Sequence, residues 1–207
     1  MQLQKYVGLL CFLICVSACK KVDPNKQIDE GNYKDQIYTS QEIGWQILVP
    51  EGWDIITKWQ NKAYQEKGKK AIEDLYGVEV DDSGLKDLIS FQKDRFNSFV
   101  SNSEPFKEEY EGEWEENEVN VKAMIYDAYV GNGIKVDTTA TSTVQIDGLD
   151  FSHFAFTLYA PNGKKILNQL MYSRLINGYS FGVILHYNNE EDKNTLQKAL
   201  FDSQFKK

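Results

Sequence analysis

The segment ILNQLMYSRLINGYSFGVILHY, residues 166–187, decides the fold of this chain. Two runs rich in apolar and aromatic residues, 166–176 and 179–187, flank the pair Asn177-Gly178. Both residues of such a pair readily take a positive φ, which the two-residue turn of a β-hairpin requires. The segment is therefore predicted to form two antiparallel strands joined by a tight turn.

The chain before this hairpin continues the same pattern. Residues 149–159, LDFSHFAFTLY, form a third apolar run, and residues 161–163, PNG, are a turn signal between that run and the hairpin. A further hairpin turn, Asp147-Gly148, separates residues 149–159 from the threonine-rich segment 134–146. Together these runs predict a four-stranded antiparallel meander.

The turns also predict the register of the strands. If Asn177-Gly178 is the whole loop, His186 faces Gln169, and if the preceding turn is equally tight, His153 faces Tyr172. Positions 169 and 172 differ by an odd number, so the two histidines of the chain should lie on opposite faces of the sheet. A shared metal site is not expected, and each histidine is interpreted as a hydrogen-bonded strand residue.

Both faces of the predicted sheet are apolar. One face carries Phe151, Ala155, Leu170, Tyr172, Phe181, Val183 and Leu185, and the other carries Phe154, Phe156, Leu158, Leu167, Met171 and Ile184. A sheet that is apolar on both sides must be covered on both sides. Helical spacing of apolar residues predicts helices within residues 62–77 and 119–131, and Asn188 or Asn189 should cap a third. The predicted fold is α+β, an α/β/α sandwich around a central antiparallel sheet.

Near the start of this region, a short alternating strand precedes a Pro-x-Gly-Trp turn that contains Pro50, Gly52 and Trp53. With the DG and NGY turns of the meander and a closing Ser-x-Phe at Ser203 and Phe205, the chain resembles the PsbP-like and DcrB-like family over about residues 37–206. The resemblance implies a mostly non-enzymatic family that includes a photosystem subunit, envelope lipoproteins and effector binders. The metal-binding residues of some members have no counterpart in this sequence.

The N-terminus carries a different signal. Lys5 precedes an unbroken apolar run, residues 7–16, which is followed by Ser17, Ala18 and Cys19. This pattern is typical of a secretory signal peptide and is too short for a bilayer span of about 20 residues. The segment Val-Ser-Ala-Cys resembles a bacterial lipobox, which implies cleavage before Cys19 and attachment of diacylglycerol and a further acyl chain, such as palmitate, to that cysteine.

The domain organisation follows from this resemblance. Residues 1–18 are predicted to be a lipoprotein signal peptide, residues 19–35 a flexible tether because they are polar and lack periodicity, and residues 36–207 one PsbP-like domain. The expected location is the bacterial cell envelope, lipid-anchored on the periplasmic side of the outer membrane. Cys11 and Cys15 lie inside the signal, so the mature chain would hold no disulfide.

Charge is concentrated in one segment. Residues 1–18 contain a single charged residue, Lys5, so cleavage would change the net charge from −8 to −9. Residues 104–118 hold eight acids and one base. This run is interpreted as a solvated helix start, where acids suit the helix dipole. The alternative is a surface for a basic partner, and its candidate residues are Glu108, Glu109, Glu111, Glu113 and Trp114.

No catalytic motif supports an enzyme. The sequence shows no glycine-rich phosphate loop, no nucleophile elbow and no zinc-binding HExxH pattern, and no cofactor, metal or catalytic residue is assigned. An acidic domain is also a poor candidate for nucleic-acid binding. The expected function is a membrane-tethered, non-enzymatic module for protein or peptide binding or assembly. The alternative is an envelope hydrolase whose acidic residues act in a cleft.

Overall fold

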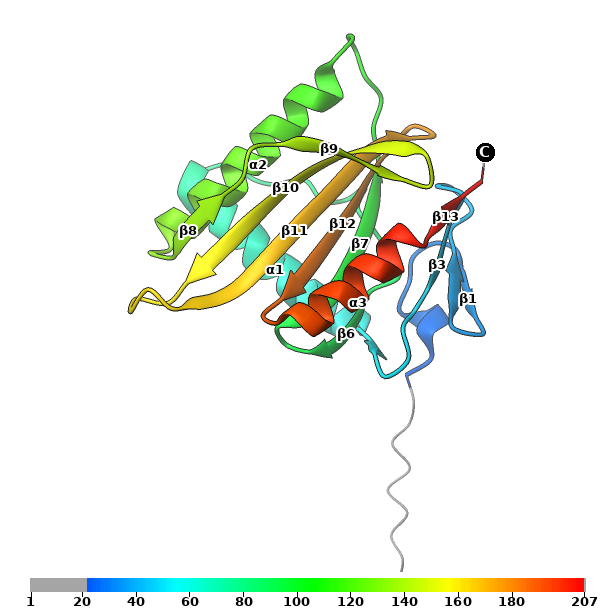
Figure 1. Ribbon diagram of the computed structural model, residues 1–207. Coiled ribbons are helices and arrows are strands. Elements are labelled where there is room, and N and C mark those ends of the chain that lie inside the picture. Colours follow the sequence, from blue (N-terminus) through cyan, green and yellow to red (C-terminus); the bar gives the residue numbers. More distant parts are fainter. Residues whose placement is uncertain (1–21, 207) are drawn as a thin grey trace, which may run out of the picture.

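Residues 22–206 are described by the computed structural model, and they form a mixed α+β fold (Figure 1). Its centre is a nine-stranded antiparallel sheet in the order β4-β6-β7-β12-β11-β10-β8, with β5 beside β7 and β9 beside β10. The strand bounds are β4 Asp54–Ile55, β5 Lys86–Asp87, β6 Phe91–Asp94, β7 Asn97–Pro105, β8 Lys135–Thr138, β9 Ser142–Ile146, β10 Leu149–Tyr159, β11 Lys165–Ile176 and β12 Tyr179–Tyr187.

The predicted meander and its register are confirmed. Gln169 pairs with His186, and Asn177 and Gly178 take φ of 55° and 78° in the turn between β11 and β12. His153 pairs with Tyr172, and this register continues along β10 and β11 until a bulge after Leu158. The predicted strand over residues 134–146 is interrupted, so that β8 and β9 form one broken edge along β10.

Both faces of the sheet are buried, as predicted. The larger core, which contains Phe151, Tyr172 and Phe181, lies under helix α3 (Glu190–Phe201) and a second sheet. The smaller core, which includes Phe154 and Phe156, packs against Ile125, Tyr129 and other residues of the opposite layer. That layer consists of α2 (Glu113–Gly131), with α1 (Lys58–Tyr76) packed beside it. The predicted α/β/α sandwich around an antiparallel sheet is therefore confirmed.

The helix ends follow local chemistry. Thr57 and Gln60 form a reciprocal capping box at the start of α1, and Gly77 ends that helix in the left-handed conformation with φ of 66°. Gly68 does not interrupt α1, although glycine costs about 1 kcal/mol relative to alanine in a helix. Asn189, rather than Asn188, caps α3 by accepting a hydrogen bond from the backbone of Asp192.

The second sheet was not predicted. It has four strands in the order β1-β2-β3-β13, and therefore brings the two ends of the described chain together. Its strands are β1 Asn32–Lys34, β2 Ile37–Thr39, β3 Trp45–Leu48 and β13 Gln204–Phe205. Trp45 is fully buried between the sheets and packs against Phe99 and Phe181 of the large sheet and Phe205 of the small one.

The N-terminal segment corrects one prediction. The tether expected over residues 19–35 is wrong for residues 22–35, which begin with a short helix, η1 (Pro24–Lys26), and are built into the domain. The Glu30 carboxylate accepts hydrogen bonds from Ser40 Oγ at 2.7 Å and from the Glu42 amide at 3.2 Å. The polar composition of this segment therefore reflects paired polar groups rather than solvated chain.

The remaining N-terminal predictions lie outside the described residues. These are the signal peptide, residues 1–18, and the lipidation of Cys19. Among residues 22–206, no helix has the length and apolar character that crossing a membrane would need.

Candidate functional site

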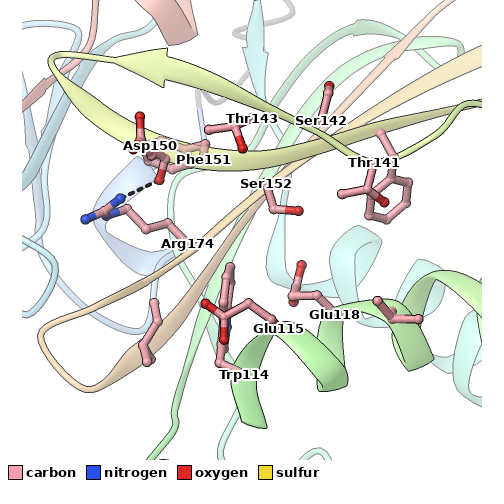
Figure 2. Close-up of a pocket in the computed structure, with 13 residues that line it drawn as sticks. Trp114, Glu115, Glu118, Thr141, Ser142, Thr143, Asp150, Phe151, Ser152 and Arg174 are labelled. Carbon is pink, nitrogen blue, oxygen red and sulfur yellow. Dashed lines mark hydrogen bonds between the residues drawn. The ribbon is translucent and has the colours of Figure 1, made fainter. Parts of the chain in front are cut away.

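A pocket of about 490 Å³ opens between α2 and the end of the large sheet where β10, with β9 beside it, separates from β11 (Figure 2). The pairing of β10 with β11 starts at Ser152 and Ser173, whereas residues 149–151 pair with β9. The strands therefore diverge beyond that point and leave a space. The residues around it are Trp114, Glu115, Glu118, Val119, Thr141, Ser142, Thr143, Asp150, Phe151, Ser152, Phe154, Arg174 and Leu175.

Arg174 lies in the gap between the diverging strands. Its guanidinium donates to the backbone carbonyl of Asp150 (Figure 2). Asp150 lies in the part of β10 that has separated from β11 and no longer pairs with it. The Arg174 Nε is buried and has no hydrogen-bond partner within residues 22–206. A buried donor without a partner costs about 1–3 kcal/mol. Arg174 thus contributes an unpaired donor that is buried beside the pocket.

Glu118 projects from α2 on the other side of the pocket. Burial raises the pKa of this carboxyl, the hydrogen bond from the Ser173 hydroxyl lowers it, and the negative charge of Glu104 raises it further. Burial also raises the pKa of Glu104. No lysine or arginine within the described chain forms an ion pair with Glu118. A cation entering the pocket would therefore stabilise its ionised form.

The acidic run expected to bind a partner lies beside this pocket. Glu108, Glu109 and Glu111 are exposed in the loop before α2, and Glu113 begins the helix. Glu108 accepts a hydrogen bond from the Trp114 backbone at 3.3 Å, and Glu113 accepts one from the Glu109 backbone. Two of the predicted acids therefore help to form the helix start, and this agrees with the structural interpretation of the run.

Trp114 differs from the four glutamates. Its side chain is buried, with 8% of the residue exposed, and its indole N–H donates to Ser180 Oγ at 3.3 Å. Trp114 therefore belongs to the pocket wall rather than to the exposed acidic surface. In the structure Trp114 and Glu118, both members of the acidic run, line the same pocket. Glu108, Glu109 and Glu111 are instead exposed to solvent.

The sequence reasoning missed the rest of the pocket. Arg174 carried one usable signal, since it is a charged residue inside an otherwise apolar strand pattern and one of two arginines in the chain. Asp150 and Ser152 carried none, because alternation along a strand cannot show that the strand leaves its neighbour. The pocket depends on that divergence.

The histidines lie on opposite faces, as the register predicted. His153 stacks on Tyr172 with ring centroids 4.4 Å apart, and its Nδ1 lies 3.0 Å from the Met171 carbonyl. The His186 side chain lies on the opposite face of the same sheet, 3.1 Å from Ser98 Oγ and 3.0 Å from the Gln169 side-chain nitrogen. No group of three or more metal-ligating side chains forms within residues 22–206.

The Ser98–His186 pair has the wrong proton arrangement for nucleophilic catalysis. Tyr129 donates to the Gln169 side-chain oxygen, so the Gln169 nitrogen donates to His186 Nε2. Nδ1 then carries the proton and donates to Ser98, whereas an activating base would accept from the serine. Burial lowers the pKa of His186 to about 4. The pair is therefore a structural hydrogen-bond chain.

Comparison with known proteins identifies the fold. No protein-family model matches the sequence, and no curated protein matches it. The structure is similar to the solution structure of cyanobacterial PsbP (CyanoP) from Synechocystis sp. PCC 6803, with a TM-score of 0.55 and 12% sequence identity. The match covers 83% of this chain and 92% of that chain. The fold is PsbP-like, as the sequence motifs predicted.

Proposed function

We propose that this protein is a lipid-anchored lipoprotein of the bacterial envelope that acts as a non-enzymatic binding or assembly module for a protein or peptide. One observation carries the binding part of the proposal. None of the eight carboxylates in residues 104–118 forms an ion pair within the described chain. Two of them, Glu115 and Glu118, line the pocket, so a basic segment of a partner would find complementary charge there.

The pocket supports a peptide as the ligand. Glu118 lines the pocket without a basic partner and could receive a lysine or arginine side chain. The rim is formed partly by β9, which pairs with β10 along one edge. Its other edge pairs with no strand of residues 22–206, so it could contact an extended chain.

A hydrolase remains the alternative, because a buried carboxyl with a raised pKa can donate a proton. Two features favour binding instead. Ser173, the hydrogen-bond partner of Glu118, does not line the pocket. Asp150 and Glu115 are exposed at its rim, where water would surround them.

The lipid anchor is tested by Cys19→Ser. The variant cannot form the thioether to diacylglycerol, so it should remain unprocessed or leave the lipid fraction when membranes are extracted with detergent. Phase partitioning and the mass of the mature N-terminus provide the measurement. A variant that is still cleaved before residue 19 and still partitions with lipid would refute the anchor.

The binding surface is tested by changing Glu108, Glu109, Glu111 and Glu113 to glutamine. Glutamine keeps the acceptor oxygens at the helix start and removes the charge, so the fold should persist, since exposed charges contribute about 0–1 kcal/mol each. Partners crosslinked in intact envelopes should be lost from this variant. Binding by the unchanged protein should also weaken steeply from low to physiological salt, where the screening length is about 8 Å.

A matched control carries the same change in net charge elsewhere. The control substitutions are Glu51→Gln, Glu66→Gln, Asp74→Asn and Glu79→Gln, all at exposed positions. The control should retain the partner, and Glu118→Gln then shows whether the pocket contributes. If all three variants capture the same partners as the unchanged protein, the acidic run is a solvated helix start only.

A further inference from the structure

We propose that the surface around Trp59, at the start of α1, lies against the lipid bilayer when the protein is anchored, so that the acidic pocket points away from the membrane. The inference rests on the proposed lipid anchor at Cys19. It adds an orientation and a second membrane contact to that anchor.

Trp59 buries little of its ring against the domain. Its exposure of 79% is the highest of any large hydrophobic residue in the described chain. It follows the N-cap of α1 by two positions and therefore sits on the first turn of the helix. An indole combines a large apolar surface with one N–H donor, and tryptophan is enriched where membranes meet water.

Hydrogen bonds connect Lys58, the neighbour of Trp59 on α1, to the point where the chain leaves the domain. The backbone N–H of Lys58 donates to the Gln27 side-chain oxygen at 3.0 Å. The amide nitrogen of the same Gln27 donates to the Asp23 carbonyl at 3.2 Å. The ammonium of Lys58 also pairs with Asp29. The start of α1 is thus joined to the N-terminal segment, and Trp59 lies beside the exit of the chain.

The remaining tether is short. The domain begins at Asp23, the N-cap of η1, so three residues separate it from the lipidated cysteine. Fully extended, the four residue steps from Cys19 to Asp23 reach at most about 14 Å. A tether of that length holds the exit end of the domain at the headgroups. A spacer over all of residues 19–35 would have left the domain free to turn.

Charge favours the same orientation. Near the exit, Asp23 pairs with Lys26 and Asp29 with Lys58, and Lys62 lines a hollow with Glu66 and other acids, so this end carries both signs of charge. Lys20 and Lys21 add two further positive charges in the sequence. The acidic run continues into the first turns of α2, which begins at the end of the molecule opposite the exit of the chain (Figure 1). Anionic lipids therefore repel the acidic end of the molecule more strongly than the exit end.

The absence of cysteine after Cys19 allows a direct test in the full protein. With Cys19 occupied by lipid, a single introduced cysteine can be spin-labelled at one site. Trp59→Cys places the label on the proposed contact. Val119→Cys, at a position 63% exposed on α2, is the matched control at the acidic end. Both lipoproteins are reconstituted into vesicles of phosphatidylcholine and phosphatidylglycerol.

Collision with a water-soluble nickel chelate and with oxygen, which concentrates in lipid, reports the position of each label. The label at position 59 should collide with nickel several-fold less, and with oxygen more, than the label at position 119. Equal nickel accessibility on protein that floats with the vesicles would overturn the orientation and leave the anchor intact. Protein that does not float with the vesicles would instead refute the anchor itself.

Discussion

Gly31→Ala should destabilise the protein by about 3 kcal/mol or more, because left-handed backbone and overpacking each cost about 1–3 kcal/mol. Gly31 has φ of 84°, and a Cβ there would lie 2.5 Å from the Thr39 carbonyl oxygen and 2.8 Å from the Tyr38 ring. Tyr38 is fully buried, so neither neighbour can move aside freely. For a domain of this size, the melting temperature should fall by roughly 6–12 °C.

Gly52→Ala is the matched control. Gly52 has φ of 80°, yet a Cβ there would meet nothing within 4 Å. Both substitutions carry the strain of the left-handed backbone, and only Gly31→Ala adds the clash. The difference between their unfolding free energies in denaturant therefore isolates the packing of the N-terminal segment. If both variants lose the same unfolding free energy, residues 22–35 do not pack as described, and the interpretation of this segment as a flexible tether would be correct.

Trp45→Ala should cost about 3–5 kcal/mol, the usual range for removing a large aromatic side chain from a core. Trp45 is fully buried, and its ring lies 4.9 Å from that of Phe181 and 5.8 Å from that of Tyr38. The cavity left by its removal would separate the small sheet from the large one. Thermal unfolding in detergent, without a bilayer, should show a fall of roughly 6–20 °C.

Two further tryptophan substitutions serve as controls for Trp45→Ala. Trp59→Ala removes an exposed ring and should change the unfolding free energy by less than about 0.5 kcal/mol in detergent. Trp45→Phe keeps an aromatic ring and removes a buried indole N–H that has no partner within residues 22–206, so it should cost less than Trp45→Ala. A Trp45→Ala protein as stable as Trp59→Ala would contradict the proposed core.

The meander could be predicted residue by residue because its information is local. Asn177-Gly178 and Asp147-Gly148 supply the positive φ values of two-residue turns, and each turn sets the register of the strands beside it. Alternation then assigns each side chain to a face. Long strands with tight turns leave few alternatives, and this half of the fold follows from the sequence for that reason.

The small sheet could not be predicted, because its pairing is distant and its strands are short. β13 has two residues, Gln204 and Phe205, too few for any periodic pattern. Residues 22–35 were misread as a tether because a segment whose polar groups pair with one another has the same composition as a solvated one. The acid-rich region was found by counting charge, whereas the pocket beside it arises from strand divergence, which composition does not record.

The pairing of β3 with β13 also has a consequence for the order in which the molecule is completed. A chain made from its N-terminus presents Trp45 early and Phe205 almost last. At about 5–20 residues per second, the roughly 160 residues between them take on the order of 10–30 s to follow. Until then, β3 has an open edge and Trp45 lacks one of its aromatic neighbours. The small sheet therefore starts with the first strands made and is completed only by the last one, β13. A chain that ends a few residues early would lack β13, and its small sheet would remain incomplete.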